Sequence, residues 1–243
     1  MMLTRTSAWR LARSIGTLAC LAAPAAGTAF RPGPASAQSP PMAQPVEPGP
    51  AAGTPSPAVM APIEGFRAAR FGMSEPEVRR AIQQDFPAGA RRLLRTTHPR
   101  ERTTVLTIMA EELLPDAGLA QLSYILGYAS RRLIQVNVVW SSDGRSAARD
   151  EAVVAAANVL RDHFLTQRLA PPDETVTNQR VGENAFLLFR AAQADSRMVL
   201  LLLSGAAAAG RANQTPAPPL TLQLAYISNY KIPDVFHIER GHF

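Results

Sequence analysis

Residues 119–140 have the sequence LAQLSYILGYASRRLIQVNVVW, and this stretch decides the fold. Every second position of its first part is apolar, namely Ala120, Leu122, Tyr124 and Leu126. The same holds for its last part, at Ile134, Val136, Val138 and Trp140. Alternation of this kind is typical of a strand with one buried and one solvated face. Two such runs joined by a short segment containing glycine predict a β-hairpin, whose apolar face needs a cover.

A helix that starts at Ser74 supplies part of that cover. Ser74 is the expected N-cap, and Glu77 three residues later completes a capping box. Met73 and Val78 stand at the two positions of a hydrophobic staple, and Pro76 falls in the first turn, where its missing N–H costs little. The apolar stripe consists of Val78, Ile82 and Phe86, and Pro87 with Gly89 is expected to end the helix.

Further elements follow the same two periods. A second helix is predicted over residues 146–168, with Val153, Ala156, Leu160 and Phe164 on its apolar face. Strands are predicted over residues 103–110, 185–190, 198–203 and 220–226, and a short edge strand over 233–238. Residues 198–203 are apolar on both faces, which favours a central position. The sequence therefore predicts an α+β fold, with helices packed on one face of an antiparallel sheet.

The chain also contains a short internal match. Gln121-Leu122-Ser123-Tyr124-Ile125 returns as Gln223-Leu224-Ala225-Tyr226-Ile227, and Tyr128 and Tyr230 follow at equal distances. The match suggests two α-β-β-β-like halves, residues 63–142 and 143–243. The alternative is a chance similarity between apolar strands.

Residues 1–37 have the pattern of a secretory signal peptide. They hold four Arg and no acid, and an apolar run over residues 15–30 precedes Ala35-Ser36-Ala37, a small-x-small cleavage site. We predict cleavage after Ala37 and a periplasmic or secreted protein without a transmembrane span. The alternatives are a retained membrane anchor or a lipidated Cys20. Residues 38–62 contain eight Pro and form a predicted disordered linker, which leaves residues 63–243 as a single α+β domain.

Cys20 is the only cysteine, so cleavage leaves no disulfide, thiol nucleophile or thiolate metal site. Charge is also modest: the formal charge of the chain is +6, and four of the positive charges lie in the signal peptide. The remaining excess is local, because residues 67–102 hold nine Arg and four acids. The export signal and the absence of aromatic residues among these Arg argue against nucleic acid as a partner.

The residues Gly72-Met73-Ser74, followed by Val78 and then by antiparallel strands, resemble the start of the small outer-membrane lipoprotein of the barrel-assembly machinery. The resemblance covers about a dozen residues, and the chain departs from that family in its greater length. Residues 71–82 and 113–140 are also similar to uncharacterised secreted proteins of α-proteobacteria. These resemblances imply a helix-on-sheet fold and an envelope location, and they imply no activity.

The sequence shows no catalytic constellation, and it predicts neither a cofactor nor a metal. His98, His163, His237 and His242 form no metal motif, and no nucleophile elbow or phosphate-binding loop is present. The densest acidic cluster is Glu111, Glu112 and Asp116. Its carboxylates support an alternative function, an envelope hydrolase, if burial separates their pKa values.

Five arginines are the candidate binding surface: Arg79, Arg80, Arg91, Arg92 and Arg95. Such a group suits an acidic envelope protein or an anionic lipid or glycan surface. A solvated helix face followed by a loop explains the same residues without a partner. The sequence thus favours a non-enzymatic binding or envelope-assembly module, with the hydrolase or an inhibitor-like capping domain as alternatives.

Overall fold

The computed structural model describes residues 60–111, 113–142, 146–182, 184–205 and 219–237. All of these residues belong to one compact unit of the chain. The predicted signal peptide, its Cys20, residues 38–59 of the predicted linker, Glu112 and His242 lie outside the described residues.

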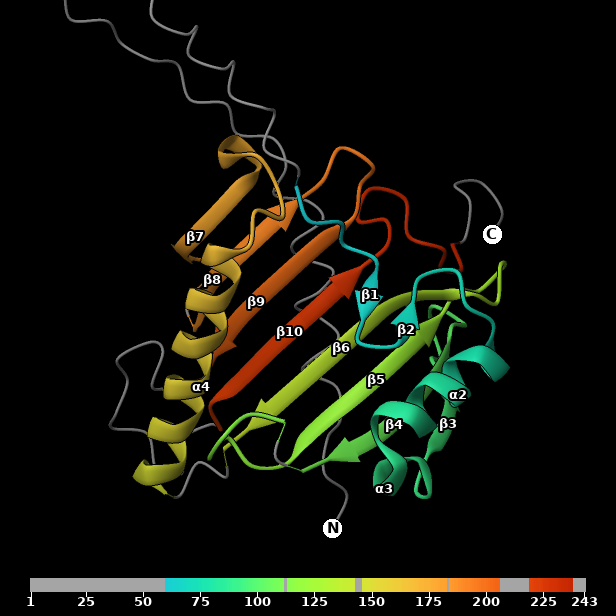
Figure 1. The fold of residues 1–243 in the computed structure, drawn as a ribbon, viewed down its shortest axis with the longest axis horizontal. Coiled ribbons are helices and arrows are strands. Elements are labelled where there is room, and N and C mark those ends of the chain that lie inside the picture. Colours follow the sequence, from blue (N-terminus) through green and yellow to red (C-terminus); the bar gives the residue numbers. More distant parts are fainter. Residues whose placement is uncertain (1–59, 112, 143–145, 183, 206–218, 238–243) are drawn as a thin grey trace, which may run out of the picture. The chain divides into compact units, whose positions relative to one another are not determined.

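Eight strands form one antiparallel sheet in the order β3-β4-β5-β6-β10-β9-β8-β7 (Figure 1). The strands are β3 (Leu94–Thr97), β4 (Thr104–Ala110), β5 (Ala120–Leu126), β6 (Leu133–Ser141), β7 (Thr175–Arg180), β8 (Ala185–Ala192), β9 (Met198–Ser204) and β10 (Thr221–Ile227). The predicted hairpin is β5–β6, in which Leu122 faces Val138 and Tyr124 faces Val136. The α+β prediction is therefore confirmed.

The described helices lie over one face of this sheet (Figure 1). Helix α2 (Glu75–Asp85) and the short α3 (Pro87–Ala90) cover the end formed by β3, β4 and β5, and α4 (Ala147–Thr166) covers β8, β9 and β10. A short hairpin lies between α2 and α4. It consists of β1 (Gly65–Phe66) and β2 (Ala69–Arg70), and β1 contacts β6 and β10. A single 3-10 turn, η1 (Pro172–Glu174), precedes β7.

The sheet consists of two halves with the same order of elements. In each half a helix precedes four strands, which run from the sheet edge to its centre, β3 to β6 and β7 to β10. Each half thus has one strand more than the suggested α-β-β-β pattern, because the edge strands β3 and β7 were not predicted. The internal sequence match is not the structural repeat, because it pairs β5 with β10, whereas β10 corresponds in position to β6.

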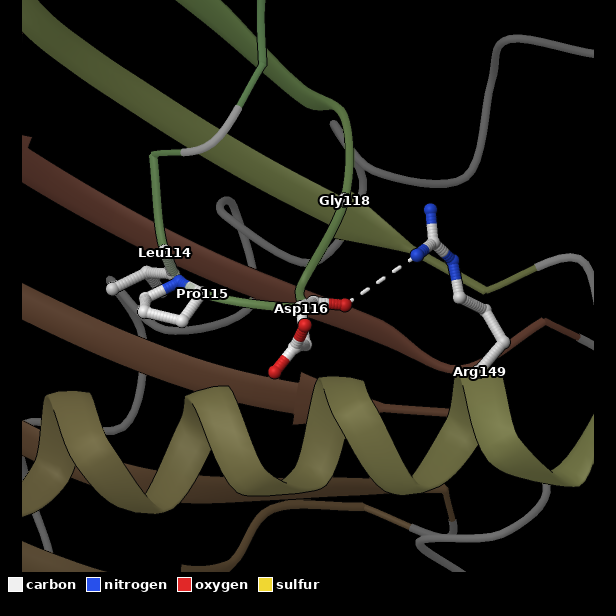
Figure 2. Close-up of a pocket in the computed structure, with 5 residues that line it drawn as sticks. All are labelled: Leu114, Pro115, Asp116, Gly118 and Arg149. Carbon is white, nitrogen blue, oxygen red and sulfur yellow. Dashed lines mark hydrogen bonds between the residues drawn. The ribbon is translucent and has the colours of Figure 1, made fainter.

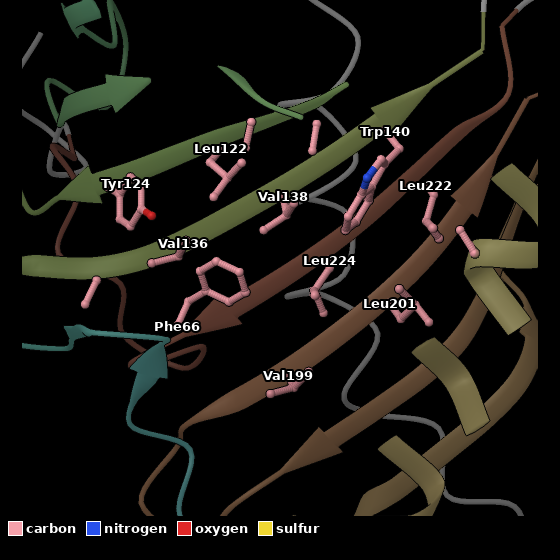
Figure 3. Packing of buried hydrophobic residues seen from close by; sticks show 14 of the residues in the cluster. Phe66, Leu122, Tyr124, Val136, Val138, Trp140, Val199, Leu201, Leu222 and Leu224 are labelled. Atoms are coloured by element: carbon pink, nitrogen blue, oxygen red, sulfur yellow. The ribbon is translucent and has the colours of Figure 1, made fainter. Parts of the chain in front are cut away.

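The core lies between the helices and the centre of the sheet (Figure 3). Tyr124 and Trp140 are its largest fully buried side chains, 0% and 1% exposed. Val138, Leu222 and Leu224 surround Trp140 from β6 and β10, and Phe164 packs from α4. Strand β9 is buried on both faces as predicted, with Leu201 in this core and Leu200 and Leu202 on the opposite face.

The predicted helix starts are confirmed. Ser74 caps α2, and its backbone N–H donates to the Glu77 carboxylate at 2.7 Å. Ser146 caps α4, and its hydroxyl accepts from the Arg149 N–H. Pro87 ends α2 as expected but also begins α3, because proline fits the first turn of a helix.

The domain begins slightly earlier than predicted. Ala61, assigned to the linker, donates its backbone N–H to the Arg168 carbonyl and accepts from the Gln193 side chain. Gln193 also binds the backbone of Ile63, which is 2% exposed. The turn of the β8–β9 hairpin therefore holds the start of the domain in place.

Residues 233–237 are not the predicted edge strand. They cross the turn between β5 and β6, where the Asp234 carboxylate accepts the N–H groups of Ala129 and Ser130 at 2.9 Å each. Burial opposes ionisation of Asp234, but these hydrogen bonds and the nearby Arg131 outweigh it and lower its pKa. Gly127 leaves room for this contact, because a Cβ there would lie 2.1 Å from the carboxylate and would displace it.

Asp234→Asn is expected to lower the free energy of unfolding by about 1–2 kcal/mol at pH 7, since a charged hydrogen-bond acceptor is lost. Because folding lowers the pKa of Asp234, its stabilisation is present above the ordinary aspartate pKa and is lost as pH falls through the lowered value. Urea unfolding at pH 7 and at about pH 3 measures both effects. Asp173→Asn, at an exposed aspartate in η1, is the control. Equal stability of the two variants at pH 7 would contradict the assignment.

Candidate functional site

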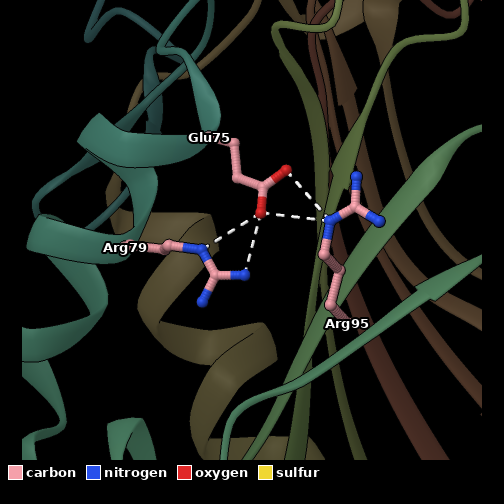
Figure 4. Close-up of polar contacts among 3 residues, drawn as sticks. All are labelled: Glu75, Arg79 and Arg95. Atoms are coloured by element: carbon pink, nitrogen blue, oxygen red, sulfur yellow. Dashed lines mark hydrogen bonds and ion pairs between the residues drawn. The ribbon is translucent and has the colours of Figure 1, made fainter.

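The candidate binding surface divides into two parts around Glu75, the first residue of α2. Arg79 donates to the Glu75 carboxylate through Nη2 at 2.8 Å, and Arg95, from β3, donates through Nε at 3.2 Å (Figure 4). The first contact is an i,i+4 pair on the helix, whereas the second joins α2 to the edge of the sheet. One carboxylate thus partly neutralises two of the five arginines.

The ionisation of Glu75 reflects this position. Burial alone would raise its pKa, but the hydrogen bonds and charges of Arg79 and Arg95 outweigh burial, and the pKa lies below its ordinary value. Near neutral pH the trio therefore carries a net charge of about +1.

The other three arginines are exposed and form no salt bridge among the described residues. Arg80 lies on α2, and Arg91 and Arg92 lie in the turn between α3 and β3. None has a carboxylate within 4 Å among the described side chains, but Arg80 interacts electrostatically with Glu77. Gly89 sets the place of this turn, because a Cβ there would lie 2.7 Å from the Met109 carbonyl of β4. The close approach of α3 to β4 brings Arg91 and Arg92 to the edge of the sheet.

Strand β3 is that edge, and sequence patterning did not identify it. All four of its residues are exposed, and Leu94 is 45% exposed. In the β3–β4 turn, the backbone N–H of His98 donates to the backbone carbonyl of Thr103. Because hydrogen bonding alternates along an antiparallel strand, the N–H groups of Arg95 and Thr97 point outward, away from β4. Only the two threonines signalled a strand, in a run too short to show alternation.

The acidic cluster does not gather into a site among the described residues. Glu111 is exposed at the end of β4, and Asp116 is exposed in the following loop. Asp116 lines an open hollow of about 620 Å³ together with Gly118 and Arg149, whose Nη1 lies 3.4 Å from the Asp116 carbonyl (Figure 2). Asp116 is the only carboxylate among the described residues that line the hollow.

The histidines are dispersed. His98 lies 3.8 Å from the Glu101 carboxylate in the β3–β4 turn, and His163 is 2.7 Å from the Gln167 side chain on α4. His237 is exposed. Across the described part of the chain, no three His, Cys, Asp or Glu residues are grouped so that they could hold a metal ion.

Comparison with known protein families, with curated proteins and with solved structures finds no match to this chain. Among the described helices none is both long and apolar enough to cross a membrane.

Glu75→Gln should cost no more than about 1 kcal/mol of stability at pH 7, because the Glu75 ion pairs lie at the surface. The lowered pKa of Glu75 means that this difference is present above the ordinary glutamate pKa and disappears as pH falls through the lowered value. Urea unfolding of the variant and of the wild type at pH 7 and about pH 3 measures it. Glu174→Gln, at an exposed glutamate in η1, is the control. A loss that persists unchanged at the lower pH would show that Glu75 acts through packing rather than charge.

Proposed function

We propose that this chain is a non-enzymatic binding module of the bacterial cell envelope. Its basic end, defined as Arg80, Arg91 and Arg92 with the β3 edge, binds an acidic, extended segment of a partner protein. Support for the compartment comes from the signal-peptide pattern of residues 1–37. Support for the site comes from one observation: Arg91 and Arg92 are exposed, form no salt bridge among the described residues, and stand beside the exposed edge strand β3.

The strand edge favours a peptide over other anions. Outward N–H and C=O groups of β3 can pair with an added strand, and such pairing supplies affinity without regard to side chains. Exposed Leu94 offers an apolar contact, and Arg91 and Arg92 select for acidic residues. A phospholipid headgroup or a glycan would use the arginines and leave the strand edge unpaired.

The opposite edge of the sheet is less suited to strand addition. Strand β7 is longer than β3, but Asn178 has a left-handed backbone conformation (φ 51°) and takes no part in the register with β8. An irregularity of this kind twists an edge away from further pairing. The basic end therefore offers the better docking edge.

The alternative functions have less support. A hydrolase built on Glu111, Glu112 or Asp116 needs two carboxylates at one cleft, and Asp116 alone lines the hollow among the described residues. An inhibitor-like capping domain would bind its partner with an open face of the sheet, whereas the arginines without a salt bridge lie at its edge.

The charge requirement is tested with a fluorescein-labelled peptide of alternating Glu and Val residues, by anisotropy at low and moderate salt. Arg91→Gln with Arg92→Gln should weaken binding about tenfold or more, and Glu75→Gln should strengthen it by freeing Arg79 and Arg95. Arg168→Gln with Arg180→Gln removes the same charge elsewhere and is the matched control. An equal loss in both double variants would mean bulk attraction only. Binding to phosphatidylglycerol vesicles but not to the peptide would indicate a lipid surface and overturn the peptide proposal.

Thr97→Pro tests the strand edge separately. The substitution removes an N–H that points away from β4, so stability should change little. Binding of the same peptide should be lost or greatly weakened, because the added strand loses a backbone donor. Thr97→Ala, which keeps the N–H, is the control. Unchanged affinity of the proline variant would exclude strand addition at β3.

A further inference from the structure

A small hollow lies over the join of the two halves, between α4 and the β1–β2 hairpin. Five rings from four elements line it: Phe66 of β1, Trp140 of β6, His163 and Phe164 of α4, and Tyr226 of β10. Its volume is about 160 Å³, and leucines complete its apolar wall. Figure 3 shows Phe66, Trp140 and Leu224 among the buried side chains of the core. A cavity of this size holds about one benzene ring.

The rings are arranged around the space rather than stacked in it. Tyr226 makes a tilted contact with Phe66, with the ring centroids 5.6 Å apart, and an edge contact with Phe164 at 6.4 Å. Aromatic rings prefer such tilted and edge-on contacts. The hollow therefore offers an added ring the same kind of neighbours.

Trp140 brings a hydrogen-bond donor without an acceptor. The side chain is 1% exposed, and its indole N–H has no hydrogen-bond partner. A buried donor normally finds a partner, because leaving it unpaired destabilises the folded chain. The indole nitrogen is also closed to water-sized molecules, so a molecule in the hollow contacts the ring of Trp140 and not its N–H.

Arg67 brings a cation to the rim of the same hollow. It occupies the turn of the β1–β2 hairpin in a left-handed conformation (φ 53°), which is uncommon for arginine and often marks a functional position. Its guanidinium lies 4.8 Å from the centroid of the Phe86 ring, and among the described residues no carboxylate lies within 4 Å of it. The lining residues that the structure describes include no Asp or Glu. The rim is therefore complementary to an anion.

We propose that this hollow binds a small aromatic monocarboxylate. The ring fits the aromatic walls, and the carboxylate meets Arg67. A free phenyl-substituted acid and the C-terminal phenylalanine of a peptide share this chemistry. The hollow shares no residue with the basic end, so a negative test of one proposal does not affect the other.

Trp140 itself reports on binding. The chain has two tryptophans, Trp9 and Trp140, so a full-length Trp9→Phe chain emits from Trp140 alone. Titration with 3-phenylpropionate should change this emission in a saturable way, with one site by calorimetry. The uncharged 3-phenylpropionamide should bind at least fivefold more weakly, because it lacks the carboxylate that meets Arg67. Acetyl-Ala-Ala-Phe, compared with the free acid, shows which source fits better.

Arg67→Gln should weaken binding at least tenfold, whereas Arg70→Gln should not, because Arg70 lies in the same hairpin but pairs with Glu64 at 3.2 Å. Leu160→Phe should block the hollow by partly filling it, and calorimetry measures that loss. The Arg91→Gln, Arg92→Gln chain should bind the acid unchanged. If the emission shows no saturation up to about 5 mM ligand, any binding is too weak for a specific small-ligand site. That result would overturn the proposal. Equal affinity of the Arg67→Gln and Arg70→Gln chains would do so as well.

Discussion

The pairing of β6 with β10 is the contact on which the rest of the structure depends. It joins the fourth strand of each half over seven residue pairs without a bulge, from Thr221 facing Ser141 to Ile227 facing Gln135. Without it, each half would be a four-stranded sheet with an open inner edge and one helical layer. The pairing also brings Leu222 opposite Trp140, so the largest buried ring is enclosed from both halves. Strand pairing and core formation are thus the same event at the centre of the sheet.

The elements that the sequence predicted are those whose burial leaves a periodic trace. The β5–β6 hairpin and α4 each pack one apolar face against the core, and strand β9 is apolar on both faces, so their apolar residues recur with the expected period. The solvated face predicted for β5 is wrong in part, because Ser123 and Ile125 on that face are buried as well. The helix starts were predictable for a local reason, because a cap involves only residues within one turn. Strands β3 and β7 left no such trace. They lie at the two edges, and β3 buries none of its residues, so the pairing partner and not the pattern makes them strands.

Two errors show where local patterns mislead. Residues 233–238 were predicted to be a strand. Instead, the Asp234 carboxylate accepts the N–H of Ser130 in the β5–β6 turn, 104 residues earlier in the sequence, and residues 233–237 pack there. The five arginines formed one group in sequence, but Arg95 returns to Glu75 across 20 residues and is partly neutralised. Neither contact has a local signal. The aromatic hollow was missed for the same reason, since its rings come from four separate elements.

The two candidate sites differ in how they relate to the central join. The basic end lies wholly within the first half, so its partner touches residues that the β6–β10 pairing does not need. The hollow takes Phe66 and Trp140 from the first half and Phe164 and Tyr226 from the second. A molecule bound there contacts both halves at once. Its binding site exists only when the two halves are joined. By mass action such a ligand stabilises the joined state by RT ln(1 + [L]/Kd), where [L] is the free ligand concentration. Ligand binding at the hollow is therefore coupled to the contact that holds the sheet together, whereas binding at the basic end is not.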